Sequence, residues 1–120
     1  MYQHPIVHIE FSAKDREAAA QFYNQVFGWE IQHMPEMNYS TFMCDEKLGG
    51  GFNPISEENP AGTVMVYIQA EDIETTLADI EAHGGKMILP KSEIPGVGWF
   101  AFFTDPAGNQ VALYKAIEQS

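Results

Sequence analysis

The first apolar residues of the chain alternate with polar ones. Residues 6–11 (IVHIEF) are rich in β-branched residues and follow this alternation, which predicts a strand. Asp15 then suits a helix N-cap, and Gly28 suits a helix end. Between them, apolar residues recur at helical spacing and predict one continuous apolar stripe: Ala19, Phe22, Tyr23, Val26 and Phe27.

The rest of the chain continues with strands and one more helix. Strands are expected at 29–32, 39–43, 63–69, 86–89, 99–103 and 111–114. A second helix should begin at Asp72 and end at Gly84-Gly85, and residues 105–109 (DPAGN) have the composition of a turn. The glycine-rich segment 48–52 predicts a bend or bulge.

These predicted elements form an internal repeat. Adding 57 to the number of Asp15 gives Asp72, and adding 57 to Gly28 gives Gly85, so a helix cap and a helix end coincide. The order of the elements in the first half then recurs in the second half. The chain is therefore expected to be a single α+β domain, residues 1–120, built from two βαβββ units at 1–58 and 62–118.

Composition narrows the functional classes. The 120 residues carry 6 Lys+Arg and 17 Asp+Glu, a formal net charge of −11, and the acids are spread over both halves. Nucleic acid and anionic membrane surfaces are therefore not expected as partners, because both attract basic surfaces. The single cysteine cannot form an internal disulfide, and the N-terminus does not resemble a signal peptide, so a cytoplasmic location is expected.

Three segments resemble the vicinal oxygen chelate superfamily, which includes glyoxalases, bleomycin-resistance proteins and extradiol dioxygenases. They are His8-Ile9-Glu10-Phe11, residues 22–29 (FYNQVFGW) and residues 105–110 (DPAGNQ). The resemblance implies that the two βαβββ units form a curved mixed sheet around a cleft, and that the chain is a homodimer that binds a small molecule.

The resemblance also implies where a divalent metal would be held. In metal-using relatives the ligands come from the first and last strands of each unit, and His8 fits one such position. Met65, Ala112 and Ile55 stand at the others, where a thioether is a poor ligand for these ions and alkyl groups are none. No metal or other cofactor is therefore expected; if a metal binds at all, His8 with Glu10 would hold it.

The same strands suggest a ligand-binding wall. His8 and Glu10 share one face of their strand, and the repeat places Met65, Tyr67 and Gln69 on the matching face of the second unit. Polar groups on a buried face need partners or water, so this face is expected to line the cleft. The competing interpretation is that His8 and Glu10 only pair with each other, with the backbone or with solvent.

Aromatic residues leave a choice open. Trp99 is either a core residue or a stacking platform at the mouth of the cleft, and Tyr39 and Tyr114 pose the same choice less strongly. Cys44 is expected to be a buried or half-buried structural thiol. The other histidines, His4, His33 and His83, are expected to be surface residues without a catalytic role.

Basic residues limit the substrate. Arg16 is the only arginine and is expected to be exposed at the start of a helix, and the lysines fall at element ends. Glutathione adducts and phosphonates need clustered cations, so glutathione-dependent glyoxalase and fosfomycin-transferase activities are disfavoured.

Three functions remain. The leading hypothesis is metal-independent binding or sequestration of a small neutral or cationic compound. The alternative is a lyase, isomerase or dioxygenase in which His8 and Glu10, with Gln69, hold a divalent metal, or in which His8 and Glu10 act as an acid/base pair without one. A dimeric interaction domain without a ligand is the third.

Overall fold

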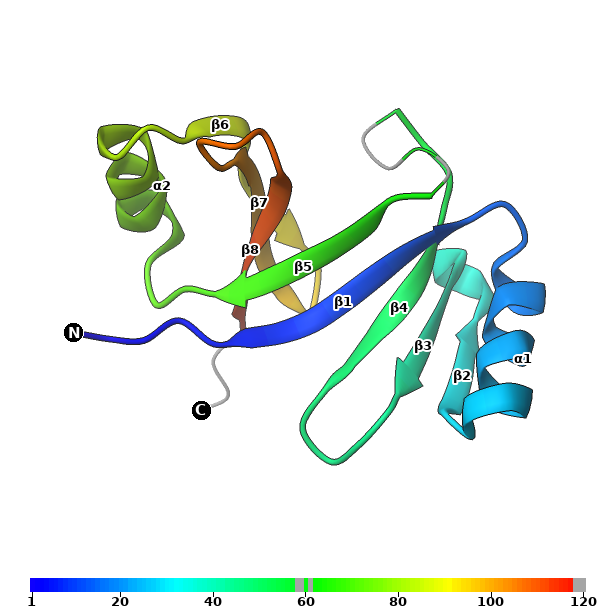
Figure 1. The fold of residues 1–120 in the computed structure, drawn as a ribbon. Coiled ribbons are helices and arrows are strands. Elements are labelled where there is room, and N and C mark those ends of the chain that lie inside the picture. The colour runs from blue at the N-terminus through cyan, green and yellow to red at the C-terminus, as the bar shows by residue number, and fades with distance from the viewer. Residues whose placement is uncertain (58–59, 61, 118–120) are drawn as a thin grey trace. The chain divides into compact units, whose positions relative to one another are not determined.

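The computed structural model of the chain describes residues 1–57, 60 and 62–117. The predicted unit ends at 58 and 118 lie outside the described residues. The chain forms two compact units: an N-terminal unit of residues 7–65, and a C-terminal unit in which residues 1–6 join residues 66–117 (Figure 1). In the C-terminal unit the Gln69 amide donates a hydrogen bond to the Pro5 carbonyl at 2.9 Å, which ties the first residues of the chain to this unit.

The N-terminal unit is a four-stranded sheet with one helix packed on it. Its elements are β1 (Ile6–Ala13), α1 (Arg16–Phe27), β2 (Glu30–Met34), the short 3-10 helix η1 (Pro35–Met37), β3 (Tyr39–Met43) and β4 (Gly49–Pro54). The strand order is β2-β3-β4-β1, with β1 parallel to β4 and the other pairs antiparallel. α1 contacts β2, β3 and β4, so one face of this sheet is covered by the helix.

The C-terminal unit repeats this arrangement. Its elements are β5 (Val64–Gln69), α2 (Ile73–Ala82), β6 (Lys86–Ile94), β7 (Gly98–Thr104) and β8 (Gln110–Ala116), in the sheet order β5-β8-β7-β6. β5 and β8 are parallel and the other pairs are antiparallel. The predicted α+β class with two βαβββ repeats is therefore confirmed.

Local signals explain both helices. The Asp15 side chain accepts a hydrogen bond from the Ala18 amide at 3.0 Å, and the Asp72 side chain accepts one from the Thr75 amide at 3.0 Å. Gly28 ends α1 in the left-handed conformation with φ 75°, where a residue with a side chain would be strained. The two predicted N-caps and the predicted end of α1 at Gly28 are thus confirmed, whereas α2 ends at Ala82 with His83 as its C-cap, before the glycines that were expected to end it.

The prediction of a bend at residues 48–52 is wrong, because Gly49–Pro54 is the strand β4. This strand lies between β1 and β3, where it is hydrogen-bonded on both sides. A Cβ on Gly50 would lie 1.7 Å from the Ile9 carbonyl oxygen, so glycine is required by the close approach of backbone and side chains. Glycine marks tight packing here and not a turn.

Each unit has its own hydrophobic core beneath its helix. In the N-terminal unit, Ala20, Phe42 and Phe52 are buried, and the partly buried residues packed on them are aromatic or aliphatic: Ile9, Phe11, Ala19, Tyr23, Trp29 and Ile31. The predicted stripe on α1 is only partly buried, because Phe22, Val26 and Phe27 are each more than half exposed. In the C-terminal unit α2 buries Ile73 and Leu77 against Ala101, Phe103 and Leu113.

Within the described residues, no helix is both long enough and apolar enough to cross a membrane.

Candidate functional site

Four polar side chains meet on the face of the N-terminal sheet that lies opposite α1. His8 and Glu10 come from β1, Tyr39 from β3 and Asn53 from β4. The register pairs Glu10 with Gly51, and Gly51 with Thr41. Because alternate residues of a strand point to opposite faces, these residues and every second residue from them share this face. The residues between them point to the other face, where Ile9, Phe11, Phe42 and Phe52 form the core beneath α1. The strands thus separate a polar face from an apolar one.

Glu10 is the centre of this polar cluster. The Tyr39 hydroxyl donates to Glu10 Oε2 at 2.7 Å, and the Asn53 side-chain amide donates to Glu10 Oε1. His8 Nε2 lies 3.0 Å from the same Oε2 and 3.0 Å from the Tyr39 hydroxyl. The side chain of Glu10 is only 12% exposed and that of His8 is 29% exposed. A carboxylate so enclosed needs such donors, because an unsolvated charge is costly.

The hydrogen bonds assign the proton on His8. The single proton of the Tyr39 hydroxyl goes to Glu10, and an ionised carboxylate can only accept. His8 Nε2 therefore carries a proton and donates it toward the Tyr39 and Glu10 oxygens. Nε2 consequently presents a donor, and no lone pair, to the centre of the cluster.

Gly51 makes the room that the Tyr39 ring occupies. A Cβ on Gly51 would lie 1.8 Å from the Tyr39 hydroxyl oxygen and 2.0 Å from the ring carbon that bears it. No side chain fits in that space while Tyr39 holds its position. Gly51 therefore positions Tyr39, and both residues belong to the cluster; the sequence left Tyr39 open between core and cleft, and it placed Gly51 only in an expected bend or bulge.

The other predicted binding residues lie on β5. Met65 and Tyr67 are buried, at 1% and 8% exposure. The Gln69 amide nitrogen donates to the Tyr2 hydroxyl at 2.9 Å, and the Gln69 carbonyl oxygen lies 2.7 Å from His4 Nδ1. Gln69 thus holds the N-terminal residues against β5. A ligand role for Met65, Tyr67 and Gln69 remains a prediction.

Trp99 was expected to be either a core residue or a stacking platform at the mouth of the cleft, and the structure places it at the core. Trp99 pairs with Lys115, whereas Phe100 pairs with Tyr114, and Tyr114 also pairs with Gln69. Trp99 therefore lies on the face opposite Gln69 and Tyr114, and it packs on the core beneath α2. The Lys91 ammonium lies 5.2 Å from the centre of the Trp99 ring, a cation–π distance.

A second polar group lies under α1, on the apolar side of the N-terminal sheet. Arg16 donates to Asn38 Oδ1 at 3.2 Å and to the fully buried Ser40 hydroxyl at 2.8 Å. His33 Nδ1 lies 2.7 Å from the same hydroxyl oxygen. The expectation that Arg16 is exposed is wrong, since its side chain is 13% exposed; the turn after η1 and the strand β3 supply its acceptors.

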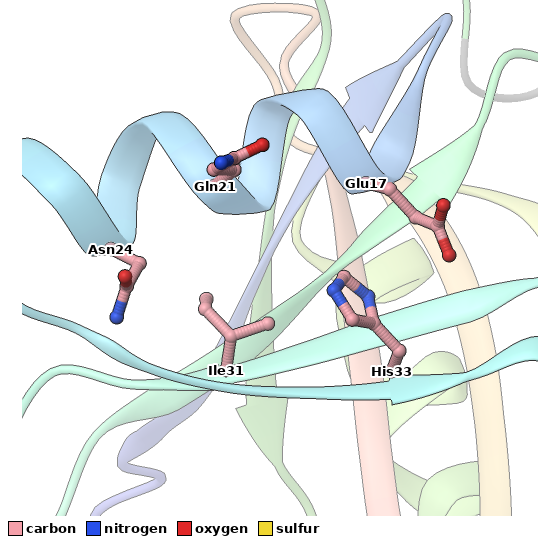
Figure 2. A pocket seen from close by; sticks show the side chains of 5 residues that line it. All are labelled: Glu17, Gln21, Asn24, Ile31 and His33. Carbon is pink, nitrogen blue, oxygen red and sulfur yellow. The ribbon is translucent and has the colours of Figure 1, made fainter.

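A groove of about 350 Å³ opens beside this group, between α1 and β2. Figure 2 shows its lining: Glu17, Gln21 and Asn24 from α1 face Ile31 and His33 from β2. His33, expected to be a surface residue, is exposed, and its ring contacts Ser40. His83 is also exposed and contacts the Asp79 carbonyl oxygen at 2.8 Å, consistent with a role at the end of α2.

Cys44 is exposed, so the expected burial of this thiol is wrong. It follows the last residue of β3 and lies in the loop before β4, where the alternation of buried positions has ended. Its Sγ lies 3.1 Å from the Leu48 carbonyl oxygen. In the same loop, the backbone N–H groups of Leu48 and Lys47 lower the pKa of Asp45, because they stabilise its carboxylate.

The comparisons with known proteins agree with the fold. The Glyoxalase/Bleomycin resistance protein/Dioxygenase superfamily matches residues 5–113 of the chain. The chain belongs to this superfamily.

Sequence relatives and a solved structure match the chain at low identity. A glyoxylase-like domain-containing protein of Didymella fabae is 32% identical over 113 residues, which cover 88% of each chain. The crystal structure of a superfamily member from Vibrio splendidus 12B01 covers 93% of this chain and 98% of its own, with a TM-score of 0.67 and 17% identity. The putative glyoxylase CFP32 of Mycobacterium tuberculosis is 26% identical over 115 residues; the match covers 90% of this chain but 44% of that protein, so this chain spans less than half its length.

The residues of this superfamily member do not fit the metal that the resemblance implies. Among the described residues, no three His, Cys, Asp or Glu side chains are grouped so that they would hold an ion. Met65 and Ala112 offer no suitable donor at the positions of expected ligands. At His8, the nitrogen that faces Glu10 bears a proton and contacts Tyr39. Within the described part of the chain, the cluster supplies one histidine and one glutamate, and its other members are a tyrosine and an asparagine.

Proposed function

We propose that this superfamily member binds a small neutral or cationic compound without a metal, and that His8, Glu10, Tyr39 and Asn53 form the polar part of its site. One observation carries the proposal. A carboxylate that is 12% exposed is held on the sheet face opposite α1 by the hydroxyl, imidazole and amide groups of three other residues. Such a convergent polar group on a half-buried surface is typical of small-molecule sites.

Charge supports a neutral or cationic ligand over an anion. Glu10 contributes a carboxylate, and the donors that hold it from Tyr39 and Asn53 are neutral groups. An anionic ligand would be repelled across a short distance in a medium of low dielectric constant. Arg16, the one arginine of the chain, bonds to Asn38 and Ser40, and Ser40 lies on the other face of the sheet. A cationic ligand is expected to bind more tightly than its neutral analogue.

Calorimetry with a matched pair of probes tests this. At pH 8, 9-aminoacridine is a planar cation and acridine is its neutral analogue; a cationic glycopeptide serves as a larger probe. We expect the cation to bind more tightly than acridine, and Glu10→Gln to remove about tenfold or more of that preference. Glu46→Gln in the exposed β3–β4 loop changes net charge equally and should leave the preference intact. No heat from any probe, or equal effects of both variants, would contradict the proposal.

A proton-transfer enzyme is the second candidate, and one observation favours it. Tyr39 Oη, His8 Nε2 and Glu10 Oε2 lie within 2.7–3.0 Å of one another, a spacing that allows protons to move between them. Mass spectrometry of a bound compound recovered from D₂O separates the candidates. An unchanged mass supports sequestration, whereas deuterium at a carbon position, lost in His8→Ala, supports catalysis.

The proposal includes a cytoplasmic homodimer. Sedimentation velocity at micromolar concentration tests the dimer, and a single species with the 13.4 kDa mass of one chain would contradict it.

A further inference from the structure

We propose that the outer edge of β2 binds an extended peptide segment with a basic side chain, which adds as a strand in the groove between α1 and β2. This edge is separate from the polar cluster around Glu10, because that cluster lies on the sheet face opposite α1. Peptide binding here goes beyond the proposed small-molecule function and does not depend on it.

The hydrogen bonds of β2 show which of its backbone groups face outward. β2 pairs with β3 on one side, and among the described residues no strand pairs with its other side. The Thr41 hydroxyl donates to the Gln32 carbonyl at 3.4 Å, so the backbone of Gln32 points toward β3. In an antiparallel strand the N–H and C=O of one residue point to the same side, and those of its neighbours point to the other. The N–H and C=O groups of Ile31 and His33 therefore face away from β3.

These outward groups lie beside the groove of about 350 Å³ between α1 and β2. Figure 2 shows Glu17 opposite His33 across this groove. The Asn24 side-chain amide donates to the Trp29 carbonyl at 2.9 Å, so this bond already occupies the outward carbonyl that precedes Ile31 by two residues. The open edge is thus short. Its two outward residues can each donate and accept one hydrogen bond with an added strand, which is how extended peptides bind to sheet edges.

The second unit has a corresponding groove at its own edge strand, and the comparison shows what distinguishes β2. That groove also measures about 350 Å³ and lies between α2 and β6. At the repeat positions of Glu17, Gln21, Asn24 and His33, it is lined by Glu74, Ala78, Glu81 and Pro90. Pro90 has no N–H, and the pairing of β6 with β7 shifts in register on both sides of Leu89. Proline and bulges keep edge strands from pairing with other chains, whereas β2 contains no proline and pairs with β3 without a shift.

Charge favours a basic peptide as the occupant of this edge. Glu17 of α1, Glu30 of β2 and Glu36 of η1 are exposed carboxylates. The one basic residue of these three elements, Arg16, donates to the buried Ser40 hydroxyl. If β2 of a second copy paired with this edge, the same carboxylates of both copies would come together, and each copy carries a formal net charge of −11. A basic peptide instead brings opposite charges together.

The geometry of the pairing specifies the probe. Residues that lie opposite each other in an antiparallel pair point to the same face. The peptide acetyl-TKTVT-amide can therefore place its lysine opposite His33, on the side of the groove where Glu17 lies, and its valine opposite Ile31. Acetyl-TETVT-amide, with glutamate in place of lysine, is the matched control peptide.

Amide hydrogen exchange followed by NMR tests the inference in the full chain. At saturation, we expect the lysine peptide to slow the exchange of the Ile31 and His33 amides by about tenfold or more, and to leave that of Gln32 unchanged because its amide already bonds to β3. The lysine peptide should bind about threefold or more tightly than the glutamate peptide. Glu17→Gln should remove this preference. Glu74→Gln, the same change at the repeat position on α2, should leave the preference intact.

Two variants at one position separate the backbone from the side chain. His33→Pro removes the outward N–H and should weaken peptide binding by about fivefold or more, whereas His33→Ala keeps that N–H and should retain binding. Circular dichroism establishes that each variant is folded. Where His33→Pro fails to fold, the exchange of the Ile31 and His33 amides in the unmodified protein decides the question.

Four results would overturn the inference. They are the absence of binding at millimolar peptide, equal affinity for the two peptides, and protection of β6 amides in place of those of Ile31 and His33. The fourth is protection of these two amides that rises with protein concentration without peptide, which would assign the edge to a second copy of the chain. The proposed small-molecule function fails separately, through the absence of heat from the organic probes.

Discussion

Ser40 is the residue whose replacement most directly tests how the N-terminal unit is held together. Its side chain is fully buried, and its hydroxyl joins Arg16 of α1 to His33 of β2. A net hydrogen bond contributes about 1 kcal/mol, and one to a charged group about 1.5–3 kcal/mol. Ser40→Ala removes both contacts. Arg16 keeps its bond to Asn38 and His33 reaches water, so we expect a loss of about 2 kcal/mol in the free energy of unfolding.

Urea denaturation measures this loss. A Trp99→Phe background leaves Trp29 as the single tryptophan, so fluorescence reports on the N-terminal unit. Ser92→Ala is the matched control, because the half-buried Ser92 hydroxyl donates to the nearby Pro90 carbonyl within the same strand; its expected effect is within about 0.5 kcal/mol. Equal midpoints for the two variants would refute the reasoning. In a double-mutant cycle, Arg16→Met and Ser40→Ala should be non-additive by about 1 kcal/mol.

Three further outcomes are expected. Ile73→Ala in the C-terminal core should lower the free energy of unfolding by about 2–5 kcal/mol in urea, because it leaves a cavity beneath α2. The Asn109 side chain and backbone lower the pKa of Asp105 from 3.8, so its stabilising effect is present above that value and is lost as the pH falls below it; a melting-temperature profile from pH 5 to 2 should be flatter in Asp105→Asn. Burial raises the pKa of Tyr114 from 10.0, so the folded protein should lose stability as the pH rises above 10, and the 295 nm titration should lose its latest-titrating component in Tyr114→Phe.

The features that the sequence predicts correctly are those whose causes are local. Asp15 and Asp72 accept hydrogen bonds from amides three residues later, and Gly28 ends α1 through its own backbone conformation. Such signals need no knowledge of distant packing, which is why both helices and the βαβββ repeat follow from the sequence. The shared face of His8 and Glu10 follows from alternation on one strand in the same way.

The features that it misses depend on contacts between distant residues. Tyr39 and Glu10 are 29 positions apart and meet only because β4 lies between their strands in one register. Arg16 is half-buried because Ser40, 24 positions later, offers an acceptor beneath α1. The glycines at 49–51 could have indicated these contacts. A strand made of glycines leaves space above its backbone, and other side chains fill that space.

Five acidic residues show the same difference between local and long-range contacts. Asp15, Asp45, Asp72 and Asp105 each accept hydrogen bonds from backbone amides within a few residues, so they fix helix starts and turns. Glu10 instead depends on side chains from β3 and β4. Substitutions at Tyr39 or Gly51 should therefore change what the Glu10 carboxylate can bind while the caps and turns persist. The chemistry of this site and the local structure of this chain are thus specified by different residues.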